Sequence, residues 1–128
     1  MRLSLVKFGL AAVVVAAETG VAQAGSDTKV ALVPGGPHPY FAAWEQAGKD
    51  AMKDFGLAAG DYRVPQKWEL AQQSQLLESL LTQGYNAFLI FPGDAVGTNA
   101  VVQEIVDNKG IAIATAGCLK DQIGRAHV

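Results

Sequence analysis

The chain has 128 residues, a formal net charge of −2, and 17% charged and 50% hydrophobic residues. A slightly acidic chain without a basic run cannot track a phosphate backbone, which argues against nucleic acid as a partner. A chain of this length forms one modest hydrophobic core, so we expect a single lobe and not several domains.

The first 24 residues have the pattern of a secretory signal peptide. Positive charges come first, residues 8–17 are small or apolar throughout, and Ala22 and Ala24 form a small-x-small cleavage site. The apolar run stops at Glu18, well short of the roughly 20 residues that span a bilayer, which argues against a membrane anchor. We therefore predict cleavage before Gly25 and a soluble product in the periplasm.

The stretch from Val30 to Phe41 is the most informative part of the sequence. Val30–Val33 is a continuous apolar run, typical of a strand buried on both faces, and the prolines and glycines behind it exclude regular structure there. His38, Tyr40 and Phe41 therefore follow the carboxyl end of a strand, where open α/β sheets bind ligands. We predict a binding site at this turn, on whose aromatic side chains a flat apolar face such as a sugar ring stacks.

A helix is predicted from Phe41 to near Gly56. Between these residues the apolar positions recur every three or four residues, which places them on one helix face. Trp44 belongs to this face, so we assign it to the core and not to the ligand. Two interpretations remain for Tyr40 and Phe41, because side chains at the start of a helix either contact a ligand or pack on the strand ends.

The second unit begins with a strand from Tyr62 to Val64 or Lys67, which Pro65 weakens. A helix follows, with an apolar ridge that ends before a closing Gly84 and consists of Leu70, Leu77, Leu80 and Leu81. Trp68 lies between the two, in the same crevice as the aromatic turn, and core packing and ligand contact stay open for it. As a ligand residue it would form the second wall of an aromatic sandwich around a pyranose.

Ala87–Phe91 is the clearest strand of the chain, and its unbroken apolar run predicts that it lies inside the sheet. A third helix is predicted to start at Asp94, a good N-cap, and to run to about Gly110. Ile111–Ala114 is predicted as a fourth strand. Two roles are open to Asp94, because one carboxylate oxygen can cap the helix while the other accepts a bond from a ligand hydroxyl.

Strands that alternate with helices of this length need right-handed parallel crossovers. The sequence therefore predicts an α/β fold with a doubly wound parallel sheet, built from one strand and helix unit that occurs three times. The single cysteine, Cys118, cannot form an internal disulfide, and we interpret it as a small buried apolar residue and not as a reactive thiol.

Motifs of catalysis are missing from the sequence. It contains no serine nucleophile elbow, no phosphate-binding loop, no dinucleotide-binding turn and no pair of histidine metal ligands. His38 and Asp94 are a conceivable acid-base pair, but no activated nucleophile or set of metal ligands accompanies them. We therefore predict a protein that is not an enzyme and that uses no cofactor and no metal.

Three segments carry a family resemblance: His38–Phe41 behind the first strand, Gln83–Val96 and Gly110–Ala114. Together they resemble the amino-terminal lobe of a type I periplasmic binding protein, most closely the ribose- and galactose-type sugar-binding proteins of ABC importers. The resemblance covers Lys29 to about Cys118. It implies the strand order 2-1-3-4, two lobes joined by a hinge, and a ligand enclosed between the lobes.

The resemblance also implies roles for single residues. In such proteins aromatic side chains after the first strand stack on the sugar, and a polar residue just ahead of them hydrogen-bonds its hydroxyls. These roles fall on Tyr40, Phe41 and His38, although by itself a histidine in a proline-rich loop is more often an ordinary polar residue. Ribose-type proteins place an Asp-Arg pair just after the fourth strand, where this chain has Ala116 and Gly117. The resemblance therefore does not identify the sugar.

The implied function is that of a periplasmic receptor, which binds a sugar or a similar small polar ligand and delivers it to an inner-membrane ABC permease. Contact with the membrane would occur only through the permease. Two alternatives are a ligand-sensing partner of a membrane chemoreceptor or kinase, which shares this lobe, and a small secreted enzyme. A transcription regulator with a related lobe is excluded, because its DNA-binding helices would stand where this chain has its signal peptide.

We expect three segments: a signal peptide over residues 1–24, the amino-terminal lobe over residues 25–118, and a truncated tail over residues 119–128. The second lobe and the hinge of the family would follow the fourth strand. The last residues, 123–128, have no apolar periodicity and match the translation of a common sequencing adapter. We expect the natural reading frame to continue past Lys120 with different residues.

Overall fold

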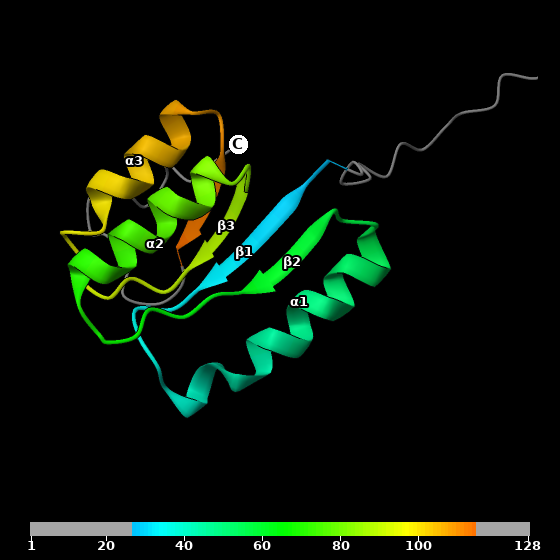
Figure 1. The fold of residues 1–128 in the computed structure, drawn as a ribbon, viewed down its shortest axis with the longest axis horizontal. Coiled ribbons are helices and arrows are strands. Elements are labelled where there is room, and N and C mark those ends of the chain that lie inside the picture. Colours follow the sequence, from blue (N-terminus) through cyan, green and yellow to red (C-terminus); the bar gives the residue numbers. More distant parts are fainter. Residues whose placement is uncertain (1–26, 115–128) are drawn as a thin grey trace, which may run out of the picture.

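A computed structural model describes residues 27–114 of the chain. Its four strands are β1 (Lys29–Val33), β2 (Ala59–Tyr62), β3 (Ala87–Ile90) and β4 (Ile111–Ala114). Its helices are the short 3-10 helix η1 (Pro39–Phe41) and the α-helices α1 (Ala42–Phe55), α2 (Leu70–Thr82) and α3 (Asn99–Asp107). All strand pairs are parallel and the sheet order is β2-β1-β3-β4, as Figure 1 shows. The predicted doubly wound sheet, its strand order and the interior position of β3 are confirmed.

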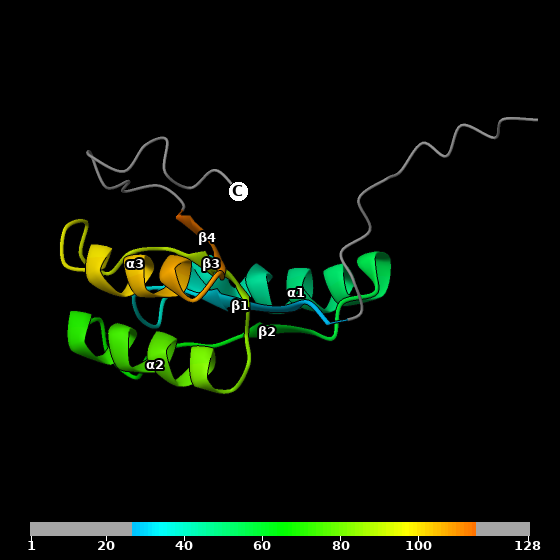
Figure 2. The same ribbon diagram turned by 90° about the horizontal axis from the view of Figure 1, so that it is seen from above.

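The helices cover the two faces of this sheet in a way that follows from the crossovers. Helix α1 packs against β1 and β2, whereas α2 and α3 run side by side over the opposite face, as the views along two axes show (Figures 1 and 2). Helix α1 comes very close to the edge strand. A Cβ at Gly48 would lie 2.3 Å from the carbonyl oxygen of Gly60, so only glycine permits this packing. Helix α1 ends before Gly56, as predicted, and Gly56 adopts the left-handed conformation.

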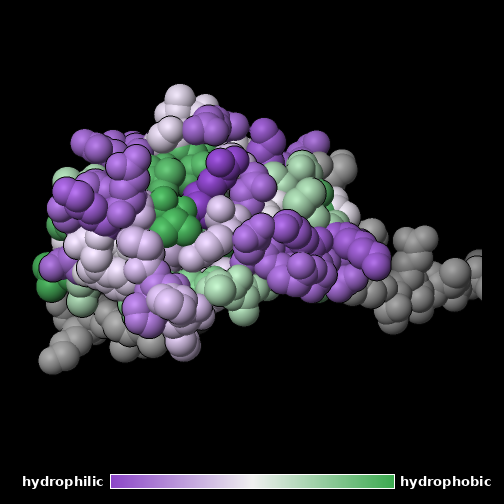
Figure 3. All heavy atoms as spheres, turned by 60° about the horizontal axis from the view of Figure 1, so that its bottom comes forward, coloured by the Kyte–Doolittle hydropathy of each residue, from purple (hydrophilic) through white to green (hydrophobic). Residues whose placement is uncertain are grey.

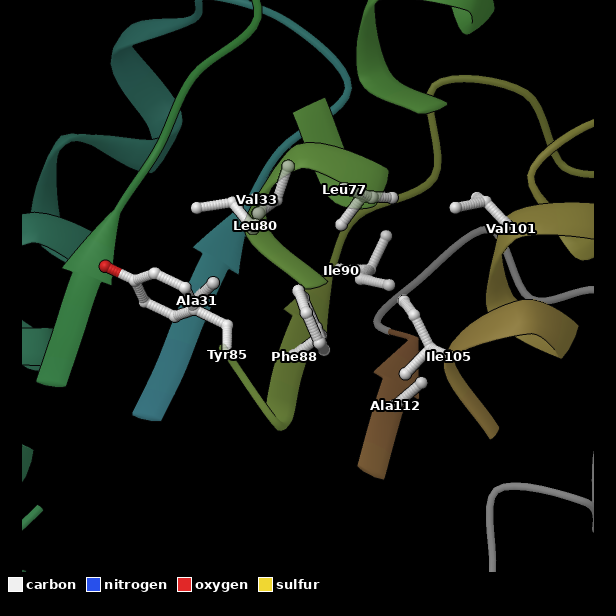
Figure 4. Packing of buried hydrophobic residues seen from close by; sticks show 10 residues of the cluster. All are labelled: Ala31, Val33, Leu77, Leu80, Tyr85, Phe88, Ile90, Val101, Ile105 and Ala112. Atoms are coloured by element: carbon white, nitrogen blue, oxygen red, sulfur yellow. The ribbon is translucent and has the colours of Figure 1, made fainter. Parts of the chain in front are cut away.

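The hydrophobic core fills the space between the sheet and helices α2 and α3. Alternate residues of the central strands point into it, which is the period of two that a pleated strand imposes. Figure 4 shows its members, which are Ala31, Val33, Leu77, Leu80, Tyr85, Phe88, Ile90, Val101, Ile105 and Ala112. Tyr85 lies at the border of the core, and its hydroxyl reaches toward β2 (Figure 4). There it donates to the carboxylate of Asp61. This bond ties the edge strand to the loop before β3.

The predicted position of the second strand was wrong. The strand runs from Ala59 to Tyr62 and pairs with β1 from Lys29 to Leu32, so it ends where the prediction had it begin. The reason is the close packing of α1 on this strand. Position 60 is a glycine because the helix backbone leaves no space for a side chain there. An edge strand with a glycine and an aspartate lacks the apolar run by which buried strands are found.

The predicted start of the third helix was also wrong, since α3 begins at Asn99 and not at Asp94. The carboxylate of Asp94 accepts the backbone N–H groups of Val96 and Gly97, which closes a turn ahead of the helix. Gly97 sits against helix α2, where an added Cβ would lie 2.1 Å from a methyl carbon of Leu70. Asp94 therefore caps a turn instead of a helix, which the same capping chemistry allows.

Several predictions concern residues outside the described range 27–114: the signal peptide over residues 1–24, Cys118, the pair Ala116 and Gly117, and the tail over residues 119–128. Within the described range, none of the helices is long and apolar enough to cross a membrane. The face of the molecule turned forward in Figure 3 is largely hydrophilic, with a small hydrophobic area enclosed by hydrophilic side chains.

Candidate functional site

The candidate site lies at the carboxyl edge of the sheet. Because the strands are parallel, the loops that follow β1, β2 and β3 meet at this edge, as Figure 1 shows. All five predicted site residues belong to these loops: His38, Tyr40 and Phe41 after β1, Trp68 after β2, and Asp94 after β3. Ligands of open α/β sheets bind at this edge, next to the point where the strand order reverses.

Phe41 is the centre of an aromatic cluster. Its side chain is only 2% exposed, because aromatic rings from three loops and from α1 surround it. The ring centroid of Phe41 lies 5.1 Å from that of Tyr40, 4.9 Å from Trp44, 6.3 Å from Trp68 and 5.1 Å from Phe91. Most of these contacts are edge-to-face, which is a favoured geometry of aromatic pairs. Phe41 is thus the floor of the site, and its neighbours carry the accessible surface.

Tyr40 presents most of its side chain to solvent and is held by two neighbours. It is 74% exposed, and its ring stands at 90° to that of Phe41. Nδ1 of His38 accepts the backbone N–H of Tyr40 at 3.1 Å, which caps η1. An imidazole that accepts at Nδ1 carries its proton on Nε2 in the neutral form, so this geometry assigns a donor to the outer nitrogen. His38 therefore orients Tyr40 and also offers a donor of its own.

Trp68 connects all three loops. Its indole Nε1 donates to the carbonyl oxygen of Gly93 at 3.3 Å. The ring packs directly on the glycines behind β1, where a Cβ at Gly36 would lie 2.7 Å from the indole and a Cβ at Gly35 would lie 2.9 Å from it. These glycines are what admits a tryptophan at this place. Trp68 stays 44% exposed, so part of the indole remains available as a binding surface.

The distance between Phe41 and Trp68 bears on the predicted aromatic sandwich. Their ring centroids are 6.3 Å apart at an interplanar angle of 30°, so the two rings pack on each other. A sugar between two aromatic faces needs about 3.5–4 Å on each side, which is more than this gap provides. The space between Phe41 and Trp68 is therefore too narrow for a sugar ring, and the accessible aromatic surface is that of Tyr40 and Trp68.

Asp94 supplies the carboxylate of the site. Its Oδ1 accepts the N–H groups of Gly97 and Val96, the latter at 3.0 Å, and these bonds lower the pKa of the Asp94 carboxyl below its usual value. The group is therefore ionised at neutral pH. Since both backbone bonds use Oδ1, the other oxygen can accept a ligand hydroxyl. The two roles predicted for Asp94 are chemically compatible, with a turn in place of the helix as the capped element.

Sequence reasoning missed two residues of this site. The sequence predicts Phe91 as the last residue of a strand, yet its ring packs on Phe41 and its ring centroid lies 6.1 Å from that of Trp68. Gln73 is not among the residues of the predicted apolar ridge, yet its side chain is fully buried. Its spacing from Leu77 and Leu80 was the available signal, because positions i, i+4 and i+7 share one helix face.

The site has no features of a metal centre within the described part of the chain. There, no three histidine, cysteine, aspartate or glutamate side chains lie together in a way that could hold a metal ion. The chemistry on offer is therefore that of aromatic faces, one carboxylate oxygen, an imidazole donor and backbone groups. These groups can stack on, and hydrogen-bond to, a small polar ligand.

Comparison with known proteins extends this description. Residues 30–126 match the sequence profile of a family described as "Periplasmic binding protein domain". This match covers more than half of the chain. No curated protein matches the sequence.

Several solved structures share this fold, and three of them are described here. A periplasmic solute-binding protein from Actinobacillus succinogenes with bound D-allose has a TM-score of 0.66 at 18% identity, covering 77% of this chain and 35% of that chain. A solute-binding protein from Burkholderia graminis in complex with D-arabinose has a TM-score of 0.64 at 20% identity, covering 70% of this chain and 30% of that chain. A periplasmic ribose ABC transporter from Conexibacter woesei has a TM-score of 0.64 at 17% identity, covering 79% of this chain and 34% of that chain.

At these identities the likeness shows the fold alone. The chain spans about a third of the length of these solved structures. The described lobe therefore corresponds to one part of such a protein.

Proposed function

The chain belongs to the periplasmic binding protein domain family, and on this premise we propose that it forms part of a receptor for a neutral sugar or a similar polyol. One observation carries the proposal. The partly exposed rings of Tyr40 and Trp68 lie at the carboxyl edge of the sheet together with the ionised Asp94. Sugars in complexes of similar folds, such as those with D-arabinose and D-allose, are consistent with this ligand class.

The chemistry of the site matches a sugar in two respects. A pyranose or furanose has faces of C–H groups, which pack on aromatic rings, and such contacts contribute about 1–3 kcal/mol per ring. Its rim carries hydroxyls, which donate to the free oxygen of Asp94 and accept from Nε2 of His38. We propose His38, Tyr40, Phe41, Trp68 and Asp94 as the ligand-binding residues, with Phe41 as the floor beneath the others.

The charge of the site favours a neutral ligand over an anionic one. Asp94 is the only carboxylate among the five proposed residues, and none of them is a lysine or an arginine. An anionic ligand would meet a carboxylate without a cationic partner, which disfavours its binding. A polyol instead uses the carboxylate as a strong hydrogen-bond acceptor.

We propose the periplasm as the location, with residues 1–24 as the cleaved signal peptide. An inner-membrane ABC permease is the proposed recipient of the ligand, and the only contact with the membrane. A role as a ligand-sensing partner of a chemoreceptor or kinase would use the same lobe. Uptake of labelled sugar by cells that lack the gene separates the two roles, because only a receptor for import is needed for uptake. As a receptor, the protein is expected to release its ligand chemically unchanged.

Replacing Tyr40 tests the proposed function. Tyr40→Ala in the full-length protein is expected to weaken sugar binding about ten- to a hundred-fold, because one stacking ring is removed. The fold is expected to stay intact, since the side chain is 74% exposed. Calorimetric titration with D-arabinose, D-allose and D-ribose measures the affinity. Tyr40→Phe keeps the ring and serves as the matched control. If stacking is the role of Tyr40, this variant binds the sugar with near-native affinity. Equal affinities of the wild type and Tyr40→Ala for every sugar bound would reject the stacking role.

Replacing Asp94 tests the carboxylate. Asp94→Asn is expected to reduce affinity more than stability, because asparagine still accepts the backbone bonds of the turn but loses the charge-assisted bond to a hydroxyl. The lowered pKa of Asp94 sets the pH range. Because the bond to a hydroxyl needs the ionised carboxylate of the folded protein, its contribution to affinity is present above the ordinary pKa of an aspartate and is lost only as the pH falls through the lower pKa of Asp94. The affinity difference should therefore be constant from pH 5 to 8 and shrink only below about pH 4. A lower melting temperature with unchanged affinity would leave Asp94 as a turn cap only.

A further inference from the structure

Gln73 on helix α2 is a buried polar residue that holds a loop of the site. Its side chain is fully buried and lies on the same helix face as Leu77 and Leu80, within the core. Its Nε2 donates to the carbonyl oxygen of Phe91 at 2.9 Å, and its Oε1 accepts the N–H of Gly93 at 2.9 Å. Both ends of one amide are thus bonded to the backbone of the loop after β3.

We propose that Gln73 is a positioning residue, which sets the binding geometry of Asp94 and Trp68 through the backbone of residues 91–93. This inference rests on the proposed function, because it assigns a role in sugar binding to a side chain that reaches no ligand itself. The alternative is a purely structural role, in which Gln73 fills the core and satisfies two backbone groups without affecting the ligand residues.

The backbone of this loop needs such a partner. Strand β3 ends at Ile90, and Pro92 has no N–H to contribute. The carbonyl of Phe91 and the N–H of Gly93 flank this proline, just after the last sheet bond, which runs from the Phe91 N–H to the carbonyl of Val33. Both groups are partly buried, and backbone groups shielded from water are normally paired. A single glutamine amide serves both groups at once. The peptide units on either side of Pro92 are therefore fixed to α2, which is a rigid element.

Both ligand residues are connected to Gly93, the residue at the end of these fixed peptide units. Asp94 follows Gly93 directly in the sequence, so the orientation of the Gly93 backbone sets the position of the Asp94 side chain. The carbonyl oxygen of the same Gly93 accepts the indole N–H of Trp68. Gln73 thus bonds to the N–H side of Gly93, and Trp68 bonds to its carbonyl. A displacement of this one residue would move the two proposed ligand groups together.

The test uses variants that keep the volume of the glutamine side chain and remove its hydrogen bonds. Gln73→Leu and Gln73→Met both do this in the full-length protein, and the second, unbranched side chain serves if the first fails to fold. Leu80→Ala is the matched control, because it opens the same core on the same helix without a bond to residues 91–93. Thermal melts set a temperature at which every variant is folded.

Two readouts separate positioning from packing. Hydrogen exchange of the Gly93 amide is expected to speed up at least tenfold in the Gln73 variants and not in Leu80→Ala. Titration with the sugar that the wild type binds best is expected to show at least tenfold weaker binding in the Gln73 variants and near-native binding in the control. Native affinity in a folded Gln73 variant would overturn the proposal, and so would undisturbed protection of the Gly93 amide.

The failure of the proposed function gives a different result. In that case the wild type binds none of the sugars, while the exchange experiment still reports whether Gln73 holds Gly93. Loss of the amide protection together with weaker sugar binding supports the positioning role. Weaker binding in Leu80→Ala to the same degree as in the Gln73 variants would count against it, because lost stability would then account for both.

Discussion

Phe41→Ala is expected to lower the free energy of unfolding by about 3–5 kcal/mol and to abolish sugar binding in the same variant. The ring is only 2% exposed and contacts Tyr40, Trp44, Trp68 and Phe91, so its loss leaves a cavity beneath the whole site. Without this floor the two exposed rings lose the surface against which they are held. Stability and binding therefore fall together, in contrast to the exposed Tyr40.

Chemical denaturation and titration of the full-length protein measure the two effects of Phe41→Ala. Phe55→Ala is the matched control, because it removes the same side chain at the last residue of the following helix, where the ring is 60% exposed. The control is expected to change stability by less than about 0.5 kcal/mol and to leave binding intact. If Phe41→Ala proves as stable as Phe55→Ala, the ring does not form the floor that the structure assigns to it.

Gly35→Ala is expected to disturb the site by forcing two of its loops apart. A Cβ at Gly35 would lie 2.6 Å from the Cα of Gly93 and 2.9 Å from the indole of Trp68, distances at which the backbone has to move. The conformation of Gly35 is not left-handed, so alanine meets no backbone strain there and the effect is steric. We expect a loss of about 1–3 kcal/mol in stability and at least tenfold weaker binding.

The same contact offers its own control for Gly35→Ala. A Cβ at Gly93 would approach the Cα of Gly35 and the Oε1 of Gln73 only to 3.3 Å, which small movements can relieve. Gly93→Ala should therefore cost less than Gly35→Ala in both denaturation and titration, although the two residues face each other. Equal effects of the two variants would show that the loss of stability and affinity comes from replacing a loop glycine as such. It would then not come from the close contact between a Cβ at Gly35 and the Cα of Gly93.

Much of the fold could be predicted because its signals are local. The apolar runs of β1, β3 and β4 and the helical spacing of α1 are properties of adjacent residues, and a buried strand or an amphipathic helix needs nothing else to be recognised. The glycine at the end of α1, Gly56, is a local signal of the same kind. The predicted position of the edge strand β2 was wrong because Gly60 is required by the packing of α1 on the strand and is not a local strand signal.

In the candidate site, too, local signals could be predicted and long-range contacts could not. That the aromatic turn, Trp68 and Asp94 would meet at one edge followed from the order of strands and loops in a parallel sheet. By itself the sequence thus determined the fold class, the loops that form the candidate site and the candidate side chains. Only the tertiary structure decided that Phe41 is the buried floor, that Asp94 caps a turn, and that Gln73 bonds to the loop of Phe91 and Gly93. These properties depend on which distant groups fill the remaining space and pair the remaining backbone atoms, and such long-range contacts leave no periodic trace in the chain.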